Sequence, residues 1–91
     1  MFQVVWHQGA VNDLAEIWNQ SDPALRQAVT RAAHAVDQAL KDDPAGVGES
    51  REAGIRVMFE SPLGVRFKVD QDSQTVVVGQ IWRMPPRRGR S

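Results

Sequence analysis

The order in which hydrophobic spacing changes along this chain of 91 residues constrains its fold more than any other feature. Residues 2–7 alternate apolar and polar side chains, which predicts a strand with one buried face. From residue 10 the apolar side chains recur every three to four positions, which predicts helix. Three further runs with strand character follow, at residues 55–60, 63–70 and 75–83. The predicted order is therefore one strand, a helical region and three strands.

Two helices are predicted in the helical region. Asp22 and Pro23 give a start signal for the second helix, because aspartate caps free amides and proline is tolerated in the first turn. That helix is expected to end near Asp42, before Pro44. The apolar stripe of the first helix, expected to face the core, consists of Val11, Leu14, Ala15 and Trp18. The stripe of the second consists of Leu25, Ala28, Val29, Ala32, Val36, Ala39 and Leu40.

Residues 43–54 hold one proline and three glycines among polar side chains, so we expect a flexible loop there. The whole pattern, β-α-α-β-β-β, predicts an α+β two-layer sandwich in which a helical hairpin packs on a mainly antiparallel sheet. A chain this short forms one hydrophobic core. We expect a single domain over residues 1–84, and residues 85–91 form a basic tail that is expected to be flexible.

The residue types exclude several kinds of chemistry. The chain has no cysteine, which excludes disulfides, thiolate metal sites and cysteine nucleophiles. Its two histidines, His7 and His34, fall on different predicted elements without a ligand-spaced companion, so no metal or cofactor is expected. No apolar run is long enough to span a membrane, and the first residues lack the pattern of a secretory signal. We expect a cytoplasmic protein.

Basic residues gather in the second part of the chain. The first fifty residues carry three basic and seven acidic side chains, whereas the remainder carries eight basic and four acidic ones. Arg56 and Glu60 share a face of one predicted strand, Arg66 and Lys68 share a face of the next, and Arg83 ends the last. If these faces coincide, they form a basic surface suited to nucleic acid. The alternative is that they are solvent-facing cross-strand partners, such as Arg66 or Lys68 with Glu60.

Several segments in order carry a resemblance to a known family. They are the run from Val5 to His7 leading into residues 14–18, Asp43-Pro44 closing the second helix, residues 62–70 with the sequence PLGVRFKVD, and residues 75–83. Together they resemble the RelE/ParE superfamily of toxins from type II toxin–antitoxin modules, also described as plasmid stabilisation proteins. The resemblance covers nearly the whole chain.

This resemblance implies a bacterial growth inhibitor neutralised by a cognate antitoxin protein. RelE-like members cleave messenger RNA in the ribosome, whereas ParE-like members block DNA gyrase without chemistry of their own. The leading expectation is ribosome-dependent mRNA cleavage. A gyrase inhibitor, or a domain of the same fold that has lost toxicity, is the alternative.

The resemblance carries over to individual residues unevenly. Arg83 falls where RelE-like enzymes have a phosphate-binding arginine, and Arg56 where a basic residue occurs. Gly64 takes the place of the family's central arginine, which leaves Arg66 displaced by two residues. Met84 follows Arg83 where a tyrosine or histidine is expected, and the chain has no tyrosine. The expected catalytic residues are Arg56, Arg66, Arg83 and a base, Glu60 or Glu52. The expected RNA contacts are Lys68, Trp82, Arg87, Arg88 and Arg90; for Trp82 a place in the core is the alternative.

Overall fold

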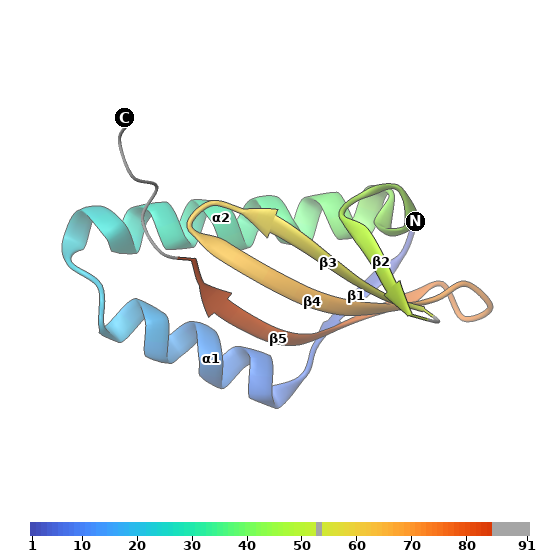
Figure 1. Cartoon of the computed structure of the whole chain (residues 1–91), viewed down its shortest axis with the longest axis horizontal. Helices are drawn as coiled ribbons and strands as arrows, with labels where there is room; N and C mark the ends of the chain where they lie inside the picture. The colour runs from blue at the N-terminus through green and yellow to red at the C-terminus, as the bar shows by residue number, and fades with distance from the viewer. Residues whose placement is uncertain (53, 85–91) are drawn as a thin grey trace.

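A five-stranded sheet with the order β1-β5-β4-β3-β2 organises the molecule (Figure 1). β1 runs parallel to β5, and the other neighbouring strands are antiparallel. The computed structural model describes residues 1–52 and 54–84. In this part of the chain the strands are β1 (Gln3–Trp6), β2 (Glu49–Glu52), β3 (Ile55–Glu60), β4 (Leu63–Asp70) and β5 (Thr75–Arg83). The helices are α1 (Gln8–Asn19) and α2 (Pro23–Asp42), and a short 3-10 turn, η1 (Pro44–Gly46), follows α2.

Most predicted elements are confirmed, including the α+β class and the bounds of the last three strands. The predicted start of α2 is confirmed as well, because Asp22 Oδ1 accepts a hydrogen bond from the Leu25 amide at 2.8 Å. The expectation of a loop over residues 43–54 is wrong in part, since η1 and β2 lie within it. β2 has the sequence ESRE with every side chain exposed. It is held to β3 by backbone pairing. Its sequence has no hydrophobic pattern from which a strand could be predicted.

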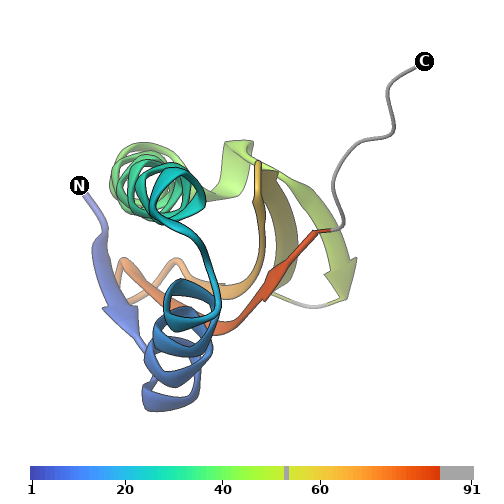
Figure 2. The same ribbon diagram turned by 90° about the vertical axis from the view of Figure 1, so that its left-hand side faces the viewer.

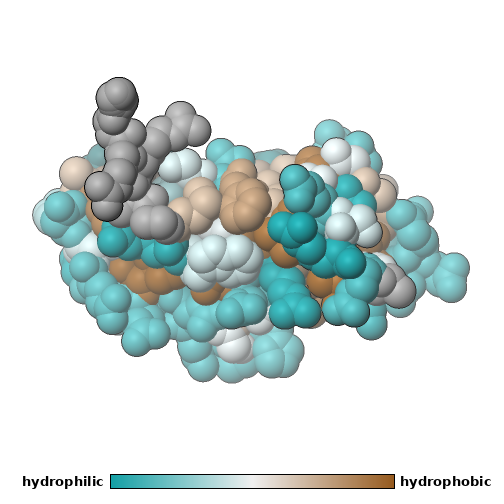
Figure 3. Space-filling view, in the orientation of Figure 1, coloured by the Kyte–Doolittle hydropathy of each residue, from teal (hydrophilic) through white to brown (hydrophobic). Residues whose placement is uncertain are grey.

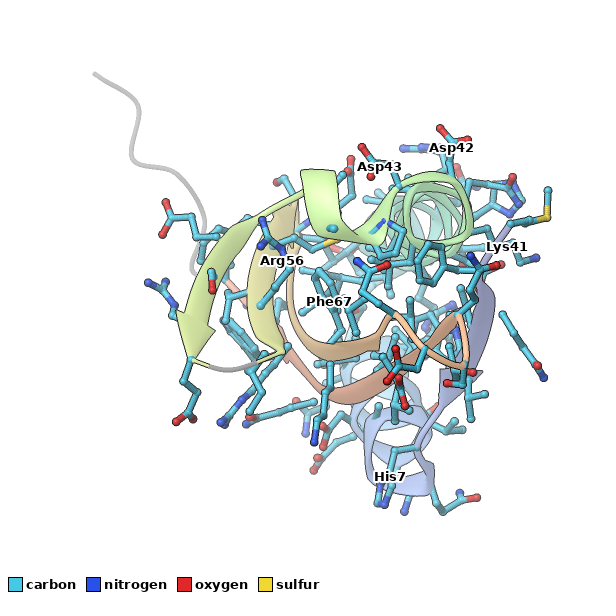
Figure 4. The ribbon with its side chains drawn as sticks, turned by 90° about the vertical axis from the view of Figure 1, so that its right-hand side faces the viewer. His7, Lys41, Asp42, Asp43, Arg56 and Phe67 are labelled. Atoms are coloured by element: carbon cyan, nitrogen blue, oxygen red, sulfur yellow. The ribbon has the colours of Figure 1, made fainter. Side chains whose placement is uncertain are left out.

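The core lies between α2 and one face of the sheet, which we call the inner face (Figure 2). Phe67 of β4 is fully buried there, between the strands and α2 (Figure 4). The predicted stripe of α2 is confirmed: Val29, Ala32, Val36 and Leu40 are all buried. Burying each large aliphatic side chain stabilises the fold by roughly 1.5–3 kcal/mol. The inner face of the sheet adds Leu63, Val65, Val76, Val78 and Ile81 to the core.

α1 packs along the edge of β5, and this turns a different stripe of the helix inward (Figure 1). Its core contacts come from Ala10, Leu14 and Ile17. The expected stripe is therefore wrong except for Leu14. Val11 and Trp18 remain 43% and 40% exposed.

Candidate functional site

The face of the sheet turned away from α2, here called the outer face, carries basic side chains. Arg66 and Lys68 of β4 are both exposed on it, because the alternate residues of the strand lie in the core. Together with neighbouring residues they border a recess of about 390 Å³. Arg66 Nη2 lies 3.9 Å from Glu52 Oε1, a long and exposed ion pair that contributes little to stability. The recess is lined by Ile55, Arg66, Phe67, Lys68, Val77, Gly79 and Gln80.

Arg56 and Glu60 do not lie on this face. In the β3–β4 register Arg56 pairs with the core residue Phe67, and Glu60 pairs with Leu63. Arg56 instead reaches the loop after α2, as Figure 4 shows, where Nε donates to the carbonyl of Val47 at 2.9 Å and Nη2 to that of Gly48 at 3.1 Å. The two-residue connection between β3 and β4 is a sequence signal for this register, because it makes residues 60 and 63 partners.

A bulge in β5 turns Arg83 away from the outer face and so separates it from Arg66. Up to Val78 the even-numbered residues face the core, but Gly79 is skipped in the pairing with β4, and Ile81 then faces the core. Arg83, paired with Leu63, is consequently directed to the helical side. There it borders a recess of about 300 Å³ at the turn between the helices, lined by Ile17, Gln20, Ser21, Asp22, Leu25 and Arg83.

The same bulge brings Trp82 to the outer face, which the core alternative for this residue did not anticipate. The Trp82 ring meets that of Phe59 edge to face, with 6.3 Å between centroids and an interplanar angle of 82°. Phe59 is 53% exposed and was not among the expected site residues. Figure 3, viewed from the strand side, shows tan and white surface between teal side chains over the strands.

A second candidate surface is an apolar groove of about 360 Å³ between α1 and α2. It contains the stripe of α1 that was expected to face the core, with Trp18 at one end. Arg26 supports that end: its guanidinium carbon lies 4.3 Å from the Trp18 ring centroid, and Nε donates to the Trp18 carbonyl at 2.9 Å. The groove is lined by Val11, Leu14, Ala15, Trp18, Asn19, Val29, Thr30 and Ala33.

Some expectations fall outside these two surfaces. Arg87, Arg88 and Arg90 lie outside the described residues. Across residues 1–52 and 54–84, no three histidine or acidic side chains come together in a way that would hold a metal ion. No helix in the same ranges is long and apolar enough to cross a membrane.

Comparisons with known proteins bear on the fold. No protein-family model matches the sequence, and no curated protein matches it. A chain of the chromosomal ParDE TA system from P. aeruginosa matches with a TM-score of 0.73 and 22% identity, over 93% of this chain and 98% of that chain. A chain of the toxin–antitoxin complex RelBE2 from Mycobacterium tuberculosis matches with a TM-score of 0.63 and 21% identity, over 90% of this chain and 96% of that chain. The isolated E. coli RelE toxin matches with a TM-score of 0.62 and 10% identity, over 96% of this chain and 88% of that chain. The chain therefore has the RelE/ParE toxin fold.

Proposed function

We propose that this protein is the toxin of a type II toxin–antitoxin module, inhibiting growth when free and neutralised when bound to a cognate antitoxin. The observation that carries the proposal is the open apolar groove between α1 and α2 on a chain with this fold. The similar solved structures include a chain of a ParDE TA system and a chain of the RelBE2 toxin–antitoxin complex. A bound partner would explain why Val11, Ala15 and Trp18 of α1 are left exposed.

An amphipathic helix of the antitoxin is the occupant that fits the groove. The lining is almost wholly apolar, and it follows two helices, as in other grooves that accept the apolar face of a third helix. Arg26 and Arg31 line an adjoining recess on the α2 side. Acidic residues along one edge of the antitoxin helix would complement these two arginines.

Inhibition of translation through messenger RNA is the mode of action that the outer face supports. Arg66 and Lys68 lie two residues apart on one strand, where the sheet restrains them better than a loop would. In a cleavage reaction Arg66 would hold the phosphate, and Glu52, on the same side of the sheet, would replace Glu60 as the base. Glu52 would take the proton of a ribose 2′-hydroxyl while its oxygen attacks the adjacent phosphate. The bond from phosphorus to the 5′-oxygen of the next nucleotide would break, leaving a 2′,3′-cyclic phosphate, and water would protonate the departing oxygen.

A second candidate is inhibition of DNA gyrase by binding alone. The separation of the expected catalytic arginines favours it: Arg56 holds loop carbonyls, Arg66 lies on the outer face and Arg83 lies beside the helical turn. The absence of tyrosine from the sequence removes one expected proton donor. A binder needs neither a shared arginine cluster nor a general acid.

Pulse-labelling of new protein and new DNA after induction in a bacterial host tests the proposal. We expect growth arrest with protein synthesis falling first, and relief of the arrest by Arg66→Ala. Arg51→Ala is the matched control, because Arg51 is an exposed arginine on β2 whose Nη1 lies 3.3 Å from Glu49 Oε1. An earlier fall in DNA synthesis would favour the gyrase candidate. Unimpeded growth at high abundance of the protein would refute the toxin proposal.

A further inference from the structure

We infer that Phe59 and Trp82 form a platform on which a base of single-stranded RNA stacks, with Arg66 and Lys68 contacting the neighbouring phosphates. The inference deepens the proposed function and rests on it for the identity of the target. Its physical basis is the arrangement of side chains on the outer face.

The platform is a row of three residues across three strands. Gly64 of β4 pairs with Phe59 on one side and with Trp82 on the other. A Cβ atom at Gly64 would overlap Cε2, Nε1 and Cζ2 of the indole, so the ring lies across the glycine. Glycine is thus the residue that lets the indole lie against the sheet. The two aromatic rings meet above it.

Exposing the platform to water is unfavourable, so its presence indicates a ligand that covers it. Phe59 leaves 53% of its surface in water, and neither Phe59 nor Trp82 is part of the core cluster. Three strands and a bulge at Gly79 cooperate to place these rings together. Aromatic rings gathered on one face of a sheet, here from the two strands that flank β4, are typical of sheets that stack unpaired bases.

Charge on the same face favours nucleic acid over an apolar protein partner. Gly64, Arg66 and Lys68 are alternate residues of β4 and lie on the same side of the strand. Successive members of this row are about 7 Å apart along the strand. Gln80 of β5 pairs with Arg66 of β4 and adds an amide suited to hydrogen bonding with a base edge. Aromatic faces beside arginine and lysine match the alternation of bases and phosphates in a single strand.

Binding of a short fluorescein-labelled single-stranded RNA to the purified full chain, followed by anisotropy, tests the inference. Stacking of one base predicts that Phe59→Ala and Trp82→Ala each weaken binding by about tenfold. Trp82→Phe is expected to retain most of the affinity that Trp82→Ala loses, because it keeps an aromatic ring. Arg66→Ala should flatten the dependence of log K on log salt by about 0.7. A duplex of the same sequence should bind more weakly, since its bases are paired and stacked.

Val5→Thr is the control, because Val5 is 41% exposed on the outer face of β1 and belongs to no part of the platform. Circular dichroism establishes that each variant is folded. Wild-type affinity in both alanine variants, or equal binding of single strand and duplex, would overturn the inference. Growth arrest that persists without RNA binding would overturn it and leave the toxin proposal intact. Arrest that is lost in the aromatic variants of a protein that binds no RNA would identify a protein target for this surface.

Discussion

Asp13 of α1 accepts a hydrogen bond from the backbone amide of Ile81, with 3.1 Å between Oδ2 and the nitrogen. The two residues lie 68 positions apart in the sequence. β1 ends at Trp6, opposite Val78, while β5 continues to Arg83. The part of β5 after Val78 therefore has no strand beside it on the β1 side. The amide of His7 donates to the Val78 carbonyl at 2.9 Å, and α1 then continues along the edge. Asp13 satisfies an edge amide that a longer β1 would have bound.

Asp13→Ala is expected to lower the free energy of unfolding by about 1–3 kcal/mol, because it leaves a part-buried amide without its charged acceptor. Urea unfolding monitored by tryptophan fluorescence gives the value. Glu16→Ala, at an exposed position of the same helix, is expected to change it little. Equal stability of the Asp13 and Glu16 variants would contradict a structural role for this contact.

Asp13 also shows why the inward face of α1 was beyond prediction from the sequence. Apolar residues spread over a wide arc of this helix, and a polar residue within the inward part hides which half is buried. The bulge at Gly79 of β5 was also not predictable from the sequence alone. A glycine inside a strand can indicate a bulge, but only the pairing with β4 shows that Trp82 faces outward and Arg83 inward as a result. The regular elements were predictable because each carries its own period. The sequence could not predict which residues of different strands share a face, because this depends on the register between the strands.

Asp37 makes the stability dependent on pH. Burial alone would raise the pKa of Asp37, but hydrogen bonds from Lys41 and Trp6 and the charges of Lys41 and His34 lower it overall. Lys41 Nζ lies 3.0 Å from Oδ2, and Trp6 Nε1 donates to Oδ1 at 3.3 Å. Because the folded pKa lies below the unfolded one, the ionised carboxylate stabilises the fold at neutral pH. This contribution is lost as the pH falls from about 4 through the lowered pKa.

Asp37→Asn should therefore be less stable than the wild type at pH 7, and the difference should shrink in acid. Urea unfolding midpoints measured from neutral pH to below pH 4 check this. Lys41→Met removes the partner cation and is expected to destabilise in the same direction, again with a difference that shrinks in acid. A gap between wild type and Asp37→Asn that widened in acid would contradict the assignment.

Arg56 is expected to act on stability and not on growth inhibition. Arg56→Met keeps the length of the side chain but removes both donors to the Val47 and Gly48 carbonyls, which should cost about 1–3 kcal/mol. Arg51→Met, on the exposed strand β2, is the matched control and should be nearly neutral. Toxicity compared at equal intracellular abundance separates the two roles. Loss of growth inhibition in folded Arg56→Met at matched abundance would return this arginine to the functional site.

The groove prediction uses Ala15, which is exposed although it lines the apolar surface between α1 and α2. Ala15→Glu places a charge where the apolar face of the antitoxin helix would be buried. It should leave the stability and growth inhibition of the free chain nearly unchanged while weakening antitoxin binding at least tenfold, because burying an unpaired carboxylate is unfavourable. Co-expression with the antitoxin would then fail to restore growth.

Ala24→Glu is the matched control, since Ala24 is an exposed alanine in the first turn of α2 that does not line the groove. A carboxylate there is compatible with the helix N-terminus. Calorimetric titration of the purified variants with the antitoxin measures the difference directly. If both variants bind the antitoxin with wild-type affinity, the antitoxin contacts another surface, and the exposed stripe of α1 requires a different partner.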